Sequence, residues 1–358
     1  MAYTTIDDPS AYFQTTLYTG NGSNDLSITN GGNSDLQPDF VWIKQRDSRD
    51  HFLFDSVRGV LQYVASNTDA AESTLSDGLK SFNSNGFTID DGVGINQNND
   101  PHVSWNWKAG TSFTNDASST GIGSIDSTGS VSTDAGFSIV KYNSSRSPSP
   151  VQTVAHGLGV KPDMLIFKNI DETQNWLVWN KTLATNKHLN LNTTSALSTD
   201  AGSLNNTAPT STVFTIGADG RTNSTTNGNP IICYAFAEKK GYSKFGSYVG
   251  NGGGAANGNF IYTGFSPAFV MIKNTTHTYN WVIQDNKRNT FNPLDRYIYP
   301  NTSGAEAQNS IYDLDLLSNG FKVRSQRSET NDTNNGYIFM AFASNPLVTS
   351  TGVPATAR

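Results

Sequence analysis

Three lysines recur at one place in a repeated sequence pattern, and their spacing raises the question of a chemical role. Each one ends an apolar run that starts six positions earlier at a proline: Pro38 to Lys44, Pro162 to Lys168 and Pro267 to Lys273. A functional lysine would lie in a ligand cleft, but the neighbouring sequence holds no second group that supports one. We therefore expect strand-end lysines whose stems cover the edge of a core while the ammonium groups stay in water. Alanine at each position would then cost about 1 kcal/mol or less.

The histidines and the single cysteine show no spacing typical of a catalytic or metal site. No two histidines stand four positions apart, none neighbours a cysteine, and the chain has no Gly-x-Ser-x-Gly motif. Surface or hydrogen-bonding roles are expected for the five histidines, which are His51, His102, His156, His188 and His277. Cys233 lies in an apolar run, which predicts a buried and inert thiol.

A pair of acids facing each other across a groove would be needed for a glycosidase built on a β-sandwich. The candidates are Asp39, Asp55, Asp90 and Asp91. The repeated pattern does not keep them, because Asp163 repeats Asp39 whereas Ala268 takes that place in the third copy. A turn or cap role is therefore favoured for the repeated acid.

Two loops resemble ion or phosphate sites, and each lacks a required part. Residues 90–100 collect oxygen ligands suited to Ca²⁺, without the EF-hand order and without a following bidentate glutamate. Residues 250–254 are rich in glycine like a phosphate-binding loop, but no Lys-Ser/Thr pair follows them. A solvated loop and a turn are favoured, so the sequence predicts no catalytic residue, no cofactor and no metal.

The lysines belong to a set of four markers that occurs three times in the same order. Nine positions after each lysine comes a short apolar strand around Leu53, Leu177 or Val282. The third marker is a strand around Phe87, Phe214 or Phe321. The fourth is a closing strand over residues 103–107, 232–236 or 338–342, with the aromatic members Trp105, Trp107, Phe236 and Phe342. The period of about 100 residues exceeds that of a solenoid repeat, so each copy is expected to hold its own core.

Composition favours an all-β fold. Of the 358 residues, 35% are hydrophobic and only 15% are charged, while 11% are aromatic. Asn-Gly pairs such as 85–86 and 319–320 are hairpin or turn signals. Aromatic strands joined by small polar loops predict three tandem antiparallel β-sandwich modules of jelly-roll-like type. The only stretch that admits a short helix is residues 68–80.

The expected boundaries follow the markers. Modules 1, 2 and 3 cover residues 1–110, 135–240 and 241–347. Residues 111–134 form a Ser/Thr/Gly-rich linker or an added hairpin, and residues 348–358 form an extended tail. Module 1 is expected to fold alone, whereas modules 2 and 3 abut at residue 241 and are expected to share an interface.

Several classes of protein do not fit this chain. No run of 18 apolar residues occurs, the first residues lack the features of a secretory signal, and one cysteine allows no intramolecular disulfide. The net charge of −6 and the pI near 5.3 argue against a nucleic-acid-binding surface. We expect a soluble protein made without secretion, with neither nucleic acid nor membrane as a partner.

Five motifs together resemble one protein family. They are residues 18–22 (YTGNG), 37–44 (QPDFVWIK), 51–59 (HFLFDSVRG), 84–87 (SNGF) and 105–109 (WNWKA). This set is similar to a family of virion-associated proteins in phages of marine bacteria and cyanobacteria. The resemblance is strongest over residues 1–110 and weaker over 135–347, and it brings no catalytic residue with it.

The resemblance implies a non-enzymatic structural protein of the virion, assembled in the cytoplasm of the host bacterium. A tail-fibre or appendage subunit is the leading interpretation, and a head decoration protein is the alternative within this class. A carbohydrate-active depolymerase and a free-standing lectin are the alternatives of other classes. Exposed aromatic side chains between polar loops could stack on host-surface glycans, although the sequence does not single out a loop.

Assembly is expected to involve symmetry. A surface with few Lys/Glu pairs favours a homo-oligomer, for which we expect a trimer. Residues 1–13 would dock it to other virion proteins, with apolar grip from Tyr3, Ile6, Tyr12 and Phe13. The alternative is that Tyr3 and Ile6 form the first strand of module 1.

Overall fold

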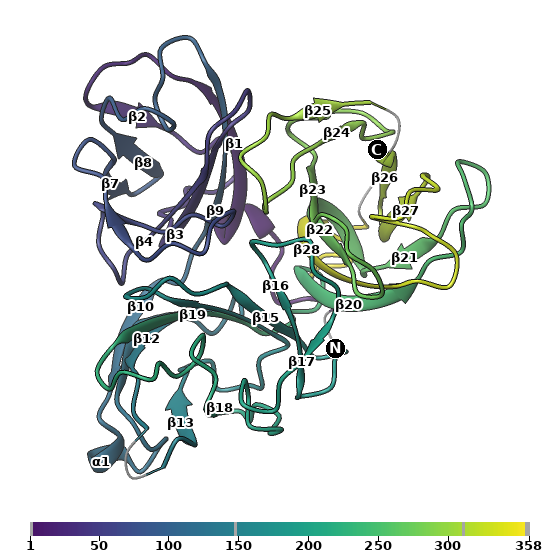
Figure 1. Ribbon diagram of the computed structural model, residues 1–358. Helices are drawn as coiled ribbons and strands as arrows, with labels where there is room; N and C mark the ends of the chain where they lie inside the picture. Colours follow the sequence, from purple (N-terminus) through teal and green to yellow (C-terminus); the bar gives the residue numbers. More distant parts are fainter. Residues whose placement is uncertain (1–2, 147–148, 310–311, 355–358) are drawn as a thin grey trace.

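Three antiparallel sheets, of four, eight and four strands, dominate the computed structural model, which describes residues 3–146, 149–309 and 312–354 (Figure 1). Each of them contains one four-stranded unit. The prediction of an all-β sandwich fold is confirmed. The three units share one strand order, in which the last strand of a repeat lies between its first and third strands. We call these four-stranded units inner sheets 1, 2 and 3, and the chain segments that form them (residues 13–107, 137–236 and 243–346) repeats 1, 2 and 3.

The closing strands of the sequence pattern are therefore central strands. Inner sheet 1 has the order β1 (Phe13–Thr19), β9 (Pro101–Trp107), β3 (Phe40–Gln45) and β4 (His51–Asp55). Inner sheet 2 has the order β12 (Phe137–Asn143), β19 (Pro230–Phe236), β14 (Met164–Asn169) and β15 (Leu177–Asn180). Inner sheet 3 has the order β20 (Ser243–Val249), β28 (Gly336–Pro346), β22 (Phe265–Asn274) and β23 (Val282–Asp285).

A smaller outer sheet covers one face of each inner sheet and completes a sandwich. The outer sheets are β2 (Leu26–Ile28), β8 (Gly86–Ile89) and β7 (Leu79–Asn83); β13 (Gln152–Ala155) and β18 (Val213–Ile216); and β21 (Phe260–Tyr262), β27 (Gly320–Val323) and β26 (Leu314–Leu317). The repeated phenylalanines Phe87, Phe214 and Phe321 are fully buried in the three sandwich cores.

The prolines of the pattern stand where a missing N–H does least harm to a strand. Pro38 and Pro162 come two residues before β3 and β14. Pro267 differs from the expected strand start, because it lies inside β22 at a register shift against β28. The following runs are apolar without alternation, which is typical of strands buried on both faces.

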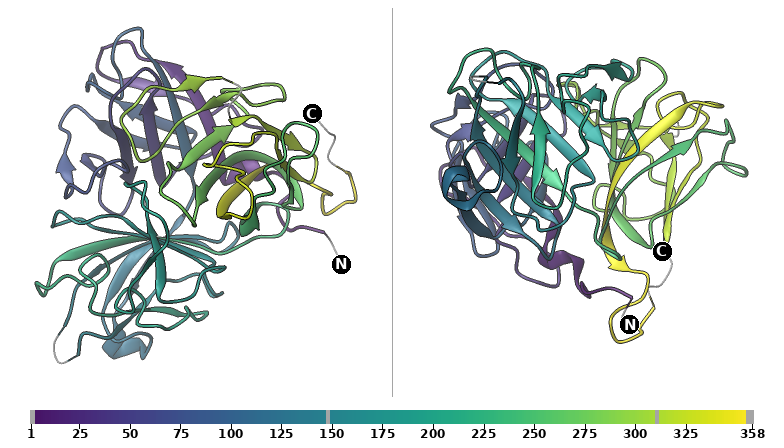
Figure 2. Two further views of the ribbon diagram at one scale, coloured as in Figure 1. Left: turned by 45° about the vertical axis from the view of Figure 1, so that its right-hand side comes forward. Right: turned by 90° about the horizontal axis from the view of Figure 1, so that it is seen from below.

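The second faces of the three inner sheets meet in one shared core. Its members include Trp42, Trp105 and Trp107 of repeat 1, Trp176, Tyr234 and Phe236 of repeat 2, and Phe269, Trp281 and Phe342 of repeat 3. The views in Figures 1 and 2 show the three lobes around this common centre. The expectation of a separate core for each module is thus incomplete. Every repeat also contributes one face of its inner sheet to the shared core, which forms only from all three repeats together.

The segment between the first two repeats forms the added hairpin and not a linker. Strands β10 (Thr111–Asn115) and β11 (Ser127–Ser132) pair, and β11 extends inner sheet 2 by pairing with β12. The short helix α1 (Ala117–Thr120) connects them. The helix expected over 68–80 is wrong, since this stretch holds β6 (Ser73–Thr74) and the start of β7, and its residues Asp69 and Glu72 form backbone hydrogen bonds with repeat 2.

The remaining described elements are short. They are the 3-10 turn η1 (Pro9–Ala11) and strands β5 (Gln62–Tyr63), β16 (Lys187–Asn190), β17 (Ser198–Thr199), β24 (Arg296–Tyr297) and β25 (Ala307–Gln308). None of the described helices is long and apolar enough to cross a membrane.

The N-terminal segment packs on its own chain and offers little apolar grip to a partner. Ile6 and Phe13 are only 3% and 2% exposed, within the shared core. The Tyr3 hydroxyl donates to Gly264 O at 2.7 Å, and the Thr4 hydroxyl donates to Lys240 O at 2.8 Å. The anchoring role expected for residues 1–13 stays a prediction, and the burial of Ile6 and Phe13 leaves Tyr3 and Tyr12 as its more accessible members. The alternative of a first strand is wrong for Tyr3 and Ile6, because the first strand of repeat 1 begins at Phe13.

The described part of the C-terminal tail forms a turn where an extended chain was expected. The backbone N–H of Thr349 donates to Val353 O, and the backbone N–H of Ser350 donates to Asp7 at 2.6 Å. Residues 355–358 of the expected tail and residues 1–2 of the expected anchor lie outside the described residues.

Candidate functional site

The three repeated lysines are buried and hydrogen-bonded, in contrast to the exposed ammonium groups that the sequence led us to expect. Lys44, Lys168 and Lys273 each have no exposed surface. Their ammonium groups donate to backbone carbonyls of the strand end or of the loop that follows, for example to Gln45 O at 2.7 Å, to Asn169 O at 2.6 Å and to Tyr279 O at 2.6 Å. Burial lowers the pKa of all three lysines to about 8.

Two of these lysines also bind the neighbouring repeat. Lys168 of repeat 2 donates to Asp69 O of repeat 1 at 3.2 Å, and Lys273 of repeat 3 donates to Thr194 O of repeat 2 at 3.0 Å. The ammonium groups therefore join the end of one inner sheet to a loop of the preceding repeat.

A second set of contacts follows the same cyclic order and closes the ring. Trp176 of repeat 2 donates its indole N–H to Ala65 O of repeat 1, and Trp281 of repeat 3 donates to Asn190 O of repeat 2, both at 2.9 Å. His51 of repeat 1 holds the corresponding place opposite Lys44, and its Nε2 lies 3.1 Å from Tyr299 O of repeat 3. Trp42 donates to His51 Nδ1 at 2.8 Å, so the imidazole is neutral and carries its proton on Nε2.

An asparagine of the same repeat fixes each of these three side chains. Asn67, Asn192 and Asn301 accept the backbone N–H of His51, Trp176 and Trp281 at 2.9–3.0 Å. Their amide groups donate in turn to Asp50, Asn175 and Asn280 at 2.7–2.8 Å. We did not predict these asparagines from the sequence, although each stands two residues after the carbonyl acceptor of its repeat (Ala65, Asn190 or Tyr299).

Buried ion pairs form a third layer at two of the three junctions. In repeat 1, Arg58 pairs with Asp55 at 2.5 Å and with Glu72 at 3.0 Å. In repeat 3, Arg288 pairs with Asp285 at 2.6 Å and with Glu306 at 3.2 Å. The acceptor Asp55 also binds the hydroxyl of Tyr234 at 2.8 Å, and Asp285 binds the indole N–H of Trp105 at 3.2 Å. The candidate acid Asp55 is thus a fully buried structural group.

Repeat 2 replaces this whole unit with less polar residues. Asn180, Leu183 and Leu197 stand at the places of Asp55, Arg58 and Glu72. The place of Tyr234 and Trp105 is held in inner sheet 3 by Met340, which carries no hydrogen-bond donor. At the junction of repeats 2 and 3, the acceptor carboxylate (now Asn180) and the donor opposite it (now Met340) have therefore been lost together. This is expected if the two positions face each other directly.

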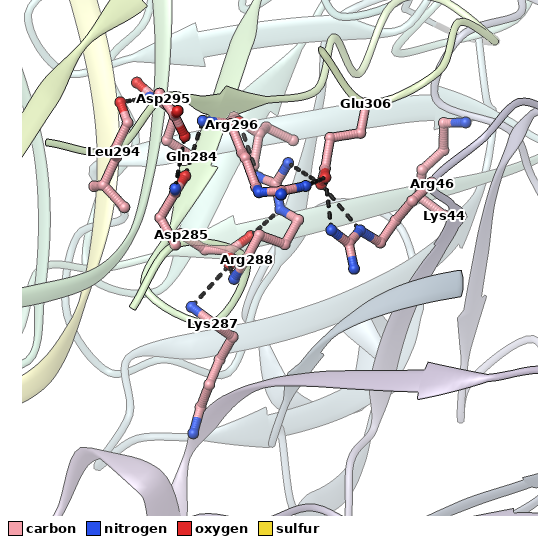
Figure 3. A network of polar contacts seen from close by, with 12 residues as sticks. Lys44, Arg46, Gln284, Asp285, Lys287, Arg288, Leu294, Asp295, Arg296 and Glu306 are labelled. Atoms are coloured by element: carbon pink, nitrogen blue, oxygen red, sulfur yellow. Dashed lines mark hydrogen bonds and ion pairs between the residues drawn. The ribbon is translucent and has the colours of Figure 1, made fainter. Parts of the chain in front are cut away.

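The junction of repeats 1 and 3 carries the densest charge network, which Figure 3 shows from close by. Glu306 accepts from Arg46 at 2.6 Å, from Arg296 at 2.9 Å and from Arg288 at 3.2 Å. Burial would raise the pKa of Glu306, but the three arginines outweigh it and hold the pKa below its usual value. Every arginine of this cluster pairs with a carboxylate, and the pair of Arg46 with Glu306 links repeat 1 to repeat 3.

The remaining candidate residues also have structural partners. Burial lowers the pKa of His102, His156 and His188 to about 4, and it raises the pKa of the Cys233 thiol. Asp39 accepts the backbone N–H groups of Ala109 and Gly110 at 2.9 and 2.6 Å. Asp163 accepts that of Glu238 at 2.6 Å. The cap interpretation of the repeated acid is therefore confirmed.

The suspected calcium loop is organised by an asparagine side chain. The Asn96 amide donates to Ser23 O and Asp90 O at 2.8 and 2.9 Å, and Asp90 also faces Lys80 at 3.6 Å. Asn223 and Asn331 do the same for the matching loops of repeats 2 and 3. Among the described residues, no three His, Cys, Asp or Glu side chains gather as a metal site would require.

Open surfaces lie away from the shared core. The space at the centre, lined by Trp42, Trp176 and Phe269 among others, has a volume of about 10 Å³ and cannot hold a ligand. A shallow hollow of about 670 Å³ lies over β11 and β12, and another of about 600 Å³ lies beside β27. The second one borders Asp313 and Arg324.

Comparison with protein families places the chain. A family model described as a domain of unknown function (DUF7483) matches residues 8–346. The chain belongs to this family. The matched range runs from the start of η1 to the end of β28, so the family unit contains all three repeats and their junctions. Searches of curated proteins and of solved structures returned no match.

Proposed function

We propose that the protein is a non-enzymatic structural component of a phage particle, a tail-fibre or appendage subunit that contacts the host surface. One observation supports this proposal above the others. Most of the lysines, histidines, acids and arginines considered above have structural partners, and several of them, such as Lys168, Lys273 and Asp55, join two repeats.

A body of this kind suits a mechanical role. Each repeat is tied to both others by side chains from different layers, and the shared core removes any free hinge between them. Polar loops rich in Asn, Ser and Thr then carry the contacts with partners. The homotrimer remains a prediction within this proposal. Because the inner faces are already covered inside one chain, its contacts would lie on the outside of the repeats.

Particle composition and imaging test the proposal. Mass spectrometry of gradient-purified virions should detect the chain, and antibody labelling in electron micrographs should mark an appendage. Labelling spread over the head at high copy number would assign it to a decoration protein instead. Absence from purified particles, or release of saccharides from host envelope material by the purified protein, would overturn the structural role.

A further inference from the structure

The outer sheet of repeat 3 differs from its two counterparts in the side chains that face away from the sandwich. On β21, Ile261 pairs with Phe321 and points into the core, so Phe260 and Tyr262 point outward. They are 48% and 52% exposed. The same register positions hold Ser27 and Thr29 in repeat 1 and Thr153 and Ala155 in repeat 2. Figure 1 shows β21, β27 and β26 on the flank of this repeat, away from the shared core.

Both aromatic rings are held in place before any ligand binds. Tyr3 donates its hydroxyl to Gly264 O, so the hydroxyl of Tyr262, 3.3 Å from that of Tyr3, acts as the donor between them. The ring of Phe260 lies over Gly320, where an added Cβ would come within 3.0 Å of it. Residues two apart on a strand are separated by about 7 Å, so the two rings form a short aromatic row.

A polar group with unused hydrogen-bonding capacity lies across the same face. Asp315 of β26 pairs with Lys322 of β27, which in turn pairs with Phe260. Asp315 is 8% exposed and accepts from Arg324 Nη1 at 2.9 Å. Its Oδ1 and the Nε of Arg324 are buried without a partner among the described residues. Arg324 also lines the hollow of about 600 Å³ beside β27.

We infer that this face of repeat 3, formed by Phe260, Tyr262, Asp315 and Arg324, binds a saccharide chain. A sugar ring has an apolar C–H face that can stack on an aromatic ring, and a rim of hydroxyl groups that donate and accept. The aromatic row matches the first feature. The unpaired Oδ1 of Asp315 and Nε of Arg324, an acceptor and a donor on the two members of one ion pair, match the second.

Two other occupants fit less well. A stable protein partner needs roughly 800 Å² of surface on each side, far more than two half-exposed rings supply. A nucleic acid would also stack on the rings, but the chain as a whole carries a net charge of −6, which disfavours the binding of phosphates. This inference deepens the host-surface contact of the proposed function and rests on it for its biological setting.

The test uses the purified full-length chain on an array of bacterial O-antigen and capsular oligosaccharides, followed by calorimetry with the best binder. We expect Phe260→Ala and Tyr262→Ala each to weaken binding at least tenfold, and Asp315→Asn to weaken it several-fold. Phe291→Ala is the matched control, because Phe291 is 82% exposed and lies outside this face. Thermal unfolding should show that all four variants remain folded, since none of the side chains removed or changed belongs to a hydrophobic core.

Three results would overturn the inference. They are no binding on the array, equal loss of binding in Phe291→Ala, and a concentration-dependent dimer that Tyr262→Ala abolishes, which would assign the face to self-association. Detection of the chain in virions is independent of these outcomes, so a failed saccharide site and a failed structural role are distinguishable.

Discussion

Single side chains carry much of the contact between repeats, and the buried lysines are the clearest case. An ammonium group in a site with no exposed surface is unfavourable unless carbonyl oxygens replace its water. Lys168 meets that condition with acceptors from two repeats, Asn169 O and Gln174 O of its own loop and Asp69 O of repeat 1. Removing the lysine leaves these buried carbonyls without a donor.

Lys168→Met should therefore lower the free energy of unfolding by about 3 kcal/mol, because several hydrogen bonds to a charged donor are lost in the interior. This expectation replaces the mild effect that an exposed lysine would show. Urea unfolding of the full chain measures it. Lys181→Met is the matched control, since Lys181 is a partly exposed lysine paired with Glu238 and should cost less than about 1 kcal/mol. Equal effects of the two substitutions would contradict the assignment.

At the level of loops and strand ends, the contacts between repeats are of two kinds, which occupy equivalent positions. Repeats 1 and 3 use the buried aspartate–arginine–glutamate unit, and repeat 2 uses Asn180, Leu183 and Leu197. A buried ion pair is weak support for stability compared with well-packed apolar groups, whereas breaking one half of it is costly. The less polar set in repeat 2 shows that this fold is compatible with either an ion-pair or an apolar contact when all residues of the contact differ together.

Converting the repeat 1 joint to the repeat 2 type gives a direct test. Asp55→Asn alone should cost about 3–5 kcal/mol, because Arg58 would remain buried with half of its charge partners. The combined change Asp55→Asn, Arg58→Leu, Glu72→Leu and Tyr234→Met should recover at least half of that loss. Thermal or urea unfolding of both variants would decide. A combined variant less stable than Asp55→Asn would show that the joints are not interchangeable.

The elements themselves were largely predictable, while their partners were not. The apolar runs, the Phe87, Phe214 and Phe321 strands and the turns before them are local patterns, and the all-β fold followed from them. The second buried face of each inner sheet was not recognised, because an uninterrupted apolar run fits a sandwich core as well as a sheet buried twice. Lys168, Lys273 and residues 69–72 were misjudged for a related reason, because they bond to loops of another repeat.

At the scale of the whole molecule, the three repeats form a closed ring around one core. Covalent links join repeats 1 to 2 and 2 to 3, and the junction of 3 to 1 depends on side chains such as Glu306 and on the N-terminal segment. The shared core is completed only when all three inner sheets are present.

A fragment of residues 1–110 is therefore expected not to fold, contrary to what its complete set of markers indicates. It would expose Trp42, Trp105 and Trp107, each of which is at most 3% exposed in the full chain. The amide spectrum of this fragment should show the narrow dispersion of an unfolded chain, and residues 1–346 should give a dispersed one. A dispersed spectrum for residues 1–110 would show that the sandwich core of repeat 1 suffices by itself.

The buried histidines predict that the protein begins to lose stability at a pH above the usual pKa values of carboxylates. The folded-state pKa of His102, His156 and His188 is about 4, against an ordinary value near 6.5. Between these values the unfolded chain binds protons that the folded chain does not, so stability falls as the pH falls. Each histidine contributes up to about 3 kcal/mol of this loss between pH 6.5 and pH 4.

Urea midpoints measured from pH 7.5 down to pH 4.5 should therefore decline from about pH 6.5 onward. His156→Gln should flatten this decline, because His156 is fully buried, accepting from Leu158 N at Nδ1 and facing Thr210 O with Nε2. His277→Gln is the control with an exposed histidine and should leave the slope unchanged. A flat profile down to pH 5 in the unsubstituted chain would mean that His102, His156 and His188 protonate inside the fold, and the lowered pKa assigned to them would be wrong.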